Sequence, residues 1–279
     1  NRPDASASRW VIDFNDRTEA EASIYELPMQ RATEVVRPER MRNKRKARRD
    51  AWWQFAERAS GMRRAIAPMS EVLVIARVSK TVMPLRVPTG QVPSEACVVF
   101  ATDSYSDQAV LSSSLHQLWA ITYGSGLRND PRYTPSDVFE TFPRPEGTAE
   151  LEEIGRTLDH ERREIMERRD LGLTKLYNLV NDPSVRGDGD VDLLRSLHVE
   201  ADSRSAAAYG WTDIDFDHGF HVFRQMQRWS VSPAARVELI DRLIETNHDR
   251  ASLDRSEGSG LSPGSAKRDR LANDGTLFG

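Results

Sequence analysis

A dense run of basic side chains lies between Arg37 and Arg49, where eight of thirteen residues are Lys or Arg. Ammonium and guanidinium groups at this density could neutralise the charges of a polyanion. A solvated helix face or a disordered basic arm is the competing interpretation, and the run alone does not decide between them. Trp52, Trp53 and Phe55 follow at once, and we expect them to be core rather than base-stacking residues.

A second set of polar side chains lies in "ARVSKTVMPLRVPTGQVPSE", residues 76–95. In a DNA groove, Arg and Lys pair with guanine, Gln pairs with adenine, and Glu accepts from cytosine. Polar strand residues can instead simply face solvent, which is the competing interpretation for Arg77 and Arg86. The candidate base-contacting residues are Arg77, Ser79, Lys80, Arg86, Thr89, Gln91, Ser94 and Glu95, and the candidate phosphate-contacting residues are Arg42, Lys44, Arg45, Lys46, Arg48 and Arg49.

Patterns typical of catalysis are scarce in the sequence. No glycine-rich loop of the P-loop or dinucleotide type occurs. The string "DHGFH" brings His218 and His221 close to Asp217, but a metal site would need further ligands from elsewhere. Residues 112–114 are serines that precede His116 on one predicted helix, a spacing that does not align a nucleophile with its base. We therefore expect no catalytic residue and no metal site.

Composition limits the class of protein. The chain has 279 residues, of which 38% are hydrophobic and 29% charged, so a core can form under a very polar surface. The single cysteine, Cys97, excludes a disulfide framework and suits a reducing cytoplasm. No apolar run is long enough to cross a membrane, and we expect a cytoplasmic protein. Because the sequence opens at Asn1 in a polar loop, we expect it to be part of a longer chain.

The net charge of −4 conceals two halves of opposite sign. Residues 1–145 carry 21 Lys and Arg against 17 Asp and Glu, whereas residues 146–279 carry 18 against 26. This asymmetry indicates two modules, with a polyanionic partner on the first.

The elements that must position these residues predict an α+β protein. A small mixed, mostly antiparallel sheet with flanking helices is expected first, followed by a helical domain. Apolar, β-branched segments predict strands over 9–14, 71–80, 81–88 and 95–102. In the first part of the chain, helical patterns predict helices after a cap at Asp16 or Thr18, through the basic stretch, over "SGMRRAIA", and from Ser106 to a cap at Gly124. In the second part they predict helices over 148–170, over "LGLTKLYNLVND" and "DVDLLRSLHVEADSRSAAAYGW", and over 232–250. The helix over 148–170 is expected to bury Leu151, Ile154, Leu158 and Ile165. The predicted domains are 1–145 and 146–250, with a disordered tail over 251–279.

Several strings, taken in order, resemble one family. They include "WWQFAER", "LRNDPRYTPSDVFETFPRP" and "AAAYGW", and the resemblance spans about residues 1 to 250. They are similar to the C-terminal part of large adenine-specific DNA methyltransferases, which are single-chain type II and type IIL restriction-modification enzymes and related phage-defence methylases. The arrangement also resembles the specificity subunits of type I systems.

The resemblance implies that this region is a DNA target-recognition domain followed by helices. It implies that an S-adenosylmethionine-binding methylase domain precedes Asn1, because neither the cofactor motif nor an Asn-Pro-Pro-Tyr type catalytic motif occurs in these 279 residues. The expected partners are double-stranded DNA and that upstream methylase domain, with no membrane. No cofactor is expected in this region itself.

Two other classes of function stay open from the sequence. The region could hold its own nuclease centre, although no Pro-Asp…Asp/Glu-x-Lys cluster is visible. It could instead be a protein-interaction module, in which the acidic helices bind a partner and the basic stretch only improves solubility.

Overall fold

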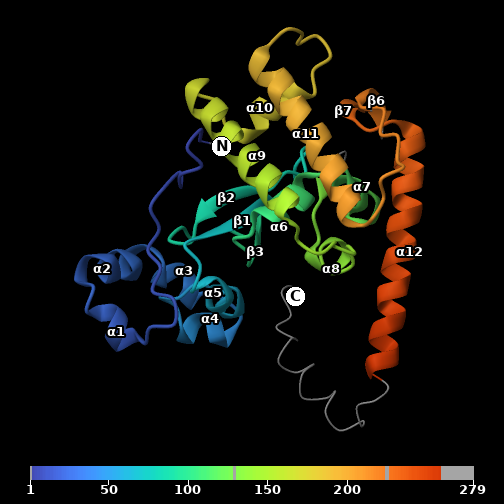
Figure 1. The fold of residues 1–279 in the computed structure, drawn as a ribbon. Coiled ribbons are helices and arrows are strands. Elements are labelled where there is room, and N and C mark those ends of the chain that lie inside the picture. The colour runs from blue at the N-terminus through green and yellow to red at the C-terminus, as the bar shows by residue number, and fades with distance from the viewer. Residues whose placement is uncertain (1, 128–129, 224–225, 259–279) are drawn as a thin grey trace. The chain divides into compact units, whose positions relative to one another are not determined.

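The computed structural model describes residues 2–127, 130–223 and 226–258, and within them the chain divides into two units (Figure 1). The smaller unit is Ala7–Ala67, and the larger unit contains the described residues of Asn1–Ser6 and Pro68–Gly279. The predicted domain boundary near residue 145 falls inside the larger unit. None of the described helices is long and apolar enough to cross a membrane.

Short helices form the smaller unit. Thr18 caps the first of them in a capping box, because its hydroxyl accepts from the backbone N–H of Glu21 while the Glu21 carboxylate accepts from that of Thr18. Pro38 lies in the first turn of the third helix, where a missing backbone N–H costs no hydrogen bond. The helices are α1 (Glu19–Ser23), α2 (Glu26–Val35), α3 (Arg37–Met41), α4 (Lys46–Asp50) and α5 (Ser60–Ile66).

The core of the smaller unit is small. Trp52 is buried in it together with Phe14, as predicted for a core tryptophan. Phe55 is 40% exposed, so the prediction of a core position for it is wrong. The strand predicted over 9–14 does not form, and Trp10 is fully exposed. An alternating pattern makes a strand only when a neighbouring strand pairs with it, and none does here.

A three-stranded antiparallel sheet begins the larger unit, as predicted. Its strands are β1 (Glu71–Ala76), β2 (Leu85–Pro88) and β3 (Cys97–Phe100), in the order β2-β1-β3. Glu71 pairs with Pro88, whereas Ala76 pairs with Cys97. The connection from β2 to β3 therefore runs from one end of β1 to the other.

Helices and two hairpins complete the larger unit. The helices are α6 (Tyr105–Ser112), α7 (Ser114–Tyr123), α8 (Pro135–Val138), α9 (Ala149–Arg168), α10 (Leu173–Val180), α11 (Gly189–Ala208) and α12 (Pro233–Gly258). The hairpins are β4 (Ser125–Leu127) with β5 (Asp130–Arg132), and β6 (Gly219–Phe223) with β7 (Met226–Ser230). The sheet and helices confirm the α+β class, but β6 and β7 interrupt the region predicted to be wholly helical.

Two predicted boundaries differ from the observed ones. The helix predicted from Ser106 to Gly124 is two helices, because Ser113 is extended and caps α7 by accepting from the His116 N–H, while Ser104 caps α6. Helix α12 continues through residues 251–258, where the tail was predicted to start. The rest of that predicted tail, 259–279, lies outside the described residues.

Helix α9 packs closely against α6, and Figure 1 shows it beside α11. Leu151, Ile154 and Leu158 are buried along it, as the periodicity predicts. Gly155 lies against the backbone of Tyr105, where an added Cβ would overlap the Tyr105 carbonyl oxygen. The approach of the two helices therefore requires a glycine at this position.

Replacing this glycine should loosen the larger unit. Gly155→Ala forces α9 away from α6, and we expect it to lower the free energy of unfolding by about 1–3 kcal/mol in urea melts. Gly189→Ala is the matched control, because Gly189 is also helical but a Cβ there meets no atom within 4 Å. Equal stability of the two variants would contradict the close-approach account.

Candidate nucleic-acid interface

The basic stretch forms two five-residue helices, α3 and α4, joined by a turn. Arg42, Lys44 and Arg45 lie in this turn and are exposed. Among the described residues no ion pair engages their charged groups. The turn thus presents three cations that are available to an anionic partner.

The remaining basic candidates are partly engaged within the smaller unit. Lys46 pairs with Asp50 at 3.0 Å, but both side chains are largely exposed, so the pair is weak and Lys46 stays accessible. Arg48 is half-buried and lies 3.9 Å from Glu57. Arg49 donates from Nη1 to the carbonyl oxygens of Asn43 at 2.7 Å and of Lys44 at 3.1 Å. Arg49 therefore closes the turn and positions the exposed cations.

One end of the three-stranded sheet gathers several of the base-contacting candidates. Arg77 follows β1 and donates from Nε to the backbone carbonyl of Glu95 at 2.9 Å, while its backbone N–H donates to Ala96 at 2.8 Å. Ser94 and Glu95 precede β3 at this same end, and both are exposed, as is Lys80. Lys80, Ser94 and Glu95 thus lie next to the end of the sheet with their side chains exposed to solvent.

The hairpin of β4 and β5 joins this end of the sheet. Tyr133 N–H donates to the carbonyl of Arg77 at 2.7 Å, and Ser79 N–H donates to that of Pro131 at 3.2 Å. Val78 and Arg132 form an isolated antiparallel bridge. We call the surface made by residues 77–80, 94–95 and the described part of this hairpin the sheet-end surface. The hairpin was missed from the sequence, although its Gly, Asn, Asp and Pro residues are typical of turns.

Arg86 is not part of this surface, and its prediction as a base-contacting residue is wrong. It lies on β2 and is only 2% exposed. Its guanidinium donates to Gln108 Oε1 at 3.1 Å and to the Asp103 carbonyl at 2.9 Å, and it lies 3.9 Å from the Tyr105 ring centre. Helix α6 covers the face of β2 that Arg86 occupies. The competing interpretation of Arg86 as a solvent-facing strand residue is therefore wrong as well.

The other candidates are also separated. Thr89 Oγ1 donates to the Met69 carbonyl at 2.8 Å, and Gln91 Nε2 donates to the Ala5 carbonyl at 3.3 Å. Both follow β2 at the end of the sheet opposite to Lys80. The hydroxyl of Ser79 accepts from the backbone of Thr81 and is half-buried. Residues 77–95 therefore do not form one continuous reading surface.

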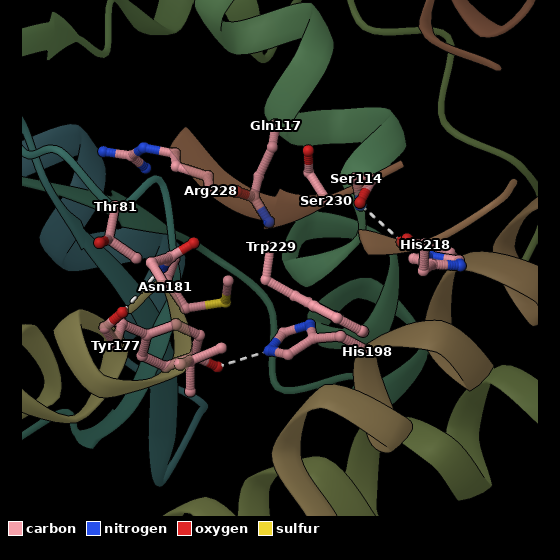
Figure 2. Close-up of a pocket in the computed structure, with 13 residues that line it drawn as sticks. Thr81, Ser114, Gln117, Tyr177, Asn181, His198, His218, Arg228, Trp229 and Ser230 are labelled. Atoms are coloured by element: carbon pink, nitrogen blue, oxygen red, sulfur yellow. Dashed lines mark hydrogen bonds and ion pairs between the residues drawn. The ribbon is translucent and has the colours of Figure 1, made fainter. Parts of the chain in front are cut away.

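Lys80 also lines an open groove of about 370 Å³, which sequence reasoning missed. The groove brings together residues from three distant parts of the larger unit. They are Lys80 and Thr81 after β1, Asn178, Asn181, Asp182 and Pro183 at the end of α10, and Gln227 and Arg228 of β7. Thr81, Asn181 and Arg228 also line a narrow pocket of about 30 Å³, shown in Figure 2, which has room for roughly one water molecule.

Buried hydrogen bonds hold the walls of this narrow pocket. Tyr177 Oη and His198 Nε2 are 2.7 Å apart (Figure 2). Burial lowers the pKa of His198 to about 4 and raises that of Tyr177, so the tyrosine hydroxyl donates to a neutral imidazole. Asp202 accepts from the Ser114 N–H at 2.6 Å and lies 2.8 Å from His218 Nε2. These bonds join α10, α11 and α7 into one support.

The histidines of "DHGFH" take part in ordinary contacts. His218 pairs with Asp202, and His221 Nε2 lies 2.9 Å from the Asp217 carbonyl oxygen. Within the described parts of the chain, no group of three or more His, Cys, Asp or Glu side chains could hold a metal ion.

His116 is a core residue. It is fully buried, with Nδ1 2.8 Å from the Leu111 carbonyl and Nε2 2.9 Å from Tyr133 Oη. Burial lowers its pKa to about 4, so the ring is neutral and accepts from Tyr133. The hydroxyl of Ser113 donates to the Val110 carbonyl at 2.7 Å. Each group is thus committed to structural hydrogen bonds.

Comparison with known protein families identifies the family of the chain. A model described as the MmeI target recognition domain matches residues 5–146. The chain belongs to the MmeI target recognition domain family. This family region contains the basic turn and the sheet-end surface, but the match ends before Asn178 and Gln227.

A solved structure supports the fold. The chain has a TM-score of 0.57 and 18% sequence identity to the type IIL restriction-modification enzyme MmeI, whose structure was determined in complex with DNA. The similarity covers 85% of this chain and 28% of that enzyme's chain, so the chain spans less than a third of MmeI. A comparison with curated proteins found no match.

The two neutral histidines make stability depend on pH. In the unfolded chain His116 and His198 should each bind a proton near their ordinary pKa of 6.5. In the folded chain each binds a proton only when the pH falls to about 4, because burial lowers its pKa to that value. The stability associated with neutral burial is therefore complete above pH 6.5 and lost as the pH falls to about 4, at roughly 3 kcal/mol per histidine. Urea unfolding measured between pH 7 and 4 should show that the free energy of unfolding falls less for His198→Gln than for the parent chain. Parallel pH profiles would contradict the assignment.

Proposed function

We propose that the chain selects the DNA site at which an adenine-N6 DNA methyltransferase of a restriction-modification or phage-defence system acts. One observation carries the proposal. Inside the MmeI-family region, the exposed side chains of Lys80, Ser94 and Glu95 project from one end of a packed sheet. Base recognition needs side chains fixed within a fraction of an ångström, and a sheet end braced by a hairpin meets that requirement.

The two units would then contribute different parts of recognition. Contacts to phosphates supply affinity and position the duplex, whereas contacts to base edges supply sequence preference. Arg42, Lys44 and Arg45 suit the first task, because they are exposed cations on a turn. Lys80 and Glu95 suit the second, because guanine offers two acceptors to a lysine and cytosine offers a donor to a carboxylate.

Methyl transfer would belong to a domain outside these 279 residues. The resemblance stated above implies such a domain upstream, together with its S-adenosylmethionine and its catalytic motif. The share of MmeI covered by this chain, 28%, is consistent with that division. The chain's own part in the reaction would be to hold the correct sequence in front of the catalytic domain.

A protein-interaction role is the second candidate, and the smaller unit favours it. Ile24 and Leu27 are 76% and 79% exposed, and Trp10 is completely exposed. Exposed large apolar side chains of this kind contribute to surfaces that bind other proteins. The methylase domain is one partner that could cover them. This role is compatible with DNA recognition by the larger unit but would not by itself produce base preference.

Exposed cations on the turn should set the salt dependence of DNA binding. Replacing Arg42, Lys44 and Arg45 together by Ala should flatten the plot of log K against log salt by ~0.9 for each lost phosphate contact. Fluorescence anisotropy with a labelled duplex measures this slope, and the loss of affinity should be alike for all sequences. Arg49 is left unchanged because it closes the turn.

The single variants Lys44→Ala and Lys175→Ala form a matched pair for this test. Lys175 is also exposed, but it lies on α10 of the larger unit, outside the basic stretch. A change in slope for Lys44→Ala and none for Lys175→Ala supports the assignment. An unchanged slope in the triple variant would show that the turn is only a solvated charge cluster.

Substitutions on the sheet-end surface should alter the preferred sequence. Lys80→Ala or Glu95→Ala should reduce discrimination at one base pair by ~1–3 kcal/mol, because a paired base contact contributes that much. Selection of bound duplexes from a randomised pool measures the preference at each position. Gln91→Ala serves as the comparison, since Gln91 lies at the opposite end of the sheet. An altered motif for Gln91→Ala alone would place base reading at that other end.

A further inference from the structure

The groove beside Lys80 extends the sheet-end surface into the half of the chain that the family match does not cover. Asn178 lies in α10 and Gln227 on β7, and both are exposed. In the described part of the chain, no hydrogen bond engages either side-chain amide. These two amides and the Lys80 ammonium group therefore line one groove.

The chemistry of the groove favours a base edge over a phosphate. An amide offers a donor and an acceptor side by side, which matches the N6 and N7 edge of adenine, whereas a phosphate oxygen only accepts. Asp182 also lines the groove. Hydrogen bonds from the Ser184 hydroxyl and backbone N–H lower the pKa of Asp182, so it remains an anion at neutral pH. Lys80 and Arg228 line the groove as well, so it is the pair of amides, and not the net charge, that favours a base edge.

A buried arginine connects two of the three segments that line the groove. Arg195 is 7% exposed and donates to the carbonyl oxygen of Val180 at 3.0 and 3.1 Å and to that of Asp182 at 3.2 Å. The same guanidinium lies 5.0 Å from the Phe220 ring centre on β6 and 5.3 Å from that of Trp229 on β7. The end of α10 and the hairpin of β6 and β7 are thus connected through one side chain, which gives the groove a defined shape before any ligand binds.

We propose that this groove reads a base pair of the DNA target, with the amides of Asn178 and Gln227 contacting a base edge next to the one contacted by Lys80. The inference rests on the proposed function, since it assumes that the sheet-end surface faces DNA. It adds residues from the region after 146 to those that determine specificity. The narrow pocket that shares Thr81, Asn181 and Arg228 with the groove is too small for a flipped base.

The test compares the full chain with its Asn178→Ala and Gln227→Ala variants. Selection from a randomised duplex pool should show lost preference at one base-pair position and unchanged preference elsewhere. Affinity for the preferred duplex should fall roughly 5- to 150-fold, while affinity for a random-sequence duplex should not change. Lys175→Ala, on the same helix α10 but outside the groove, should leave both affinities as they are.

The other outcomes are also decisive. An equal fall in affinity for both duplexes would mean a phosphate contact and would overturn base reading by the groove. Unchanged affinity and motif in both variants, with a clear motif for the parent chain, would overturn this inference alone. Absence of any sequence preference in the parent chain would overturn the proposed function as well. Both substitutions are at exposed positions, and thermal melts of the variants would verify that the fold is kept.

Discussion

A chain of buried polar side chains ties the sheet of the larger unit to its helices. Asp159 of α9 accepts from Gln108 Nε2 of α6 at 2.6 Å and from Arg163 Nε at 2.8 Å, and Gln108 in turn accepts from Arg86 of β2 at 3.1 Å. Burial acts to raise the pKa of Asp159, but Arg162, Gln108 and Arg163 lower it overall. A buried carboxylate is tolerable only when such partners surround it, so β2, α6 and α9 must keep one relative arrangement.

This constraint explains why recognition and support cannot be assigned to separate halves of the chain. Arg86 belongs to the residues predicted to read DNA, yet its guanidinium stabilises the packing of α6 on the sheet. Helix α9, predicted to start a second domain, supplies the carboxylate at the other end of the same network. Because α6 and α9 hold the sheet in place, the connections at its end can present Lys80 and Glu95 to a ligand without refolding. Helix α9 is then part of the scaffold that holds the sheet in place.

Local patterns in the sequence predicted a large part of this fold. Alternating β-branched residues located the three strands, and the helical period located α9 with its buried Leu151 and Leu158, because both patterns arise within one element. The burial of Arg86 was not predictable, since its partner Gln108 lies on a later helix and alternation alone does not say which face is covered. The groove was missed for the same reason. Its residues Lys80, Asn178 and Gln227 are far apart in sequence, and only tertiary packing brings them together.

We propose above all that DNA lies against the end of the three-stranded sheet. Amide hydrogen exchange of the chain, measured with and without its preferred duplex, tests this directly because it locates protection along the backbone. The account predicts slower exchange on DNA binding in residues 77–80 and 94–96 of the larger unit, together with the basic turn at 42–45. Protection confined to the basic turn, with exchange at 77–80 and 94–96 unchanged by the duplex, would contradict it.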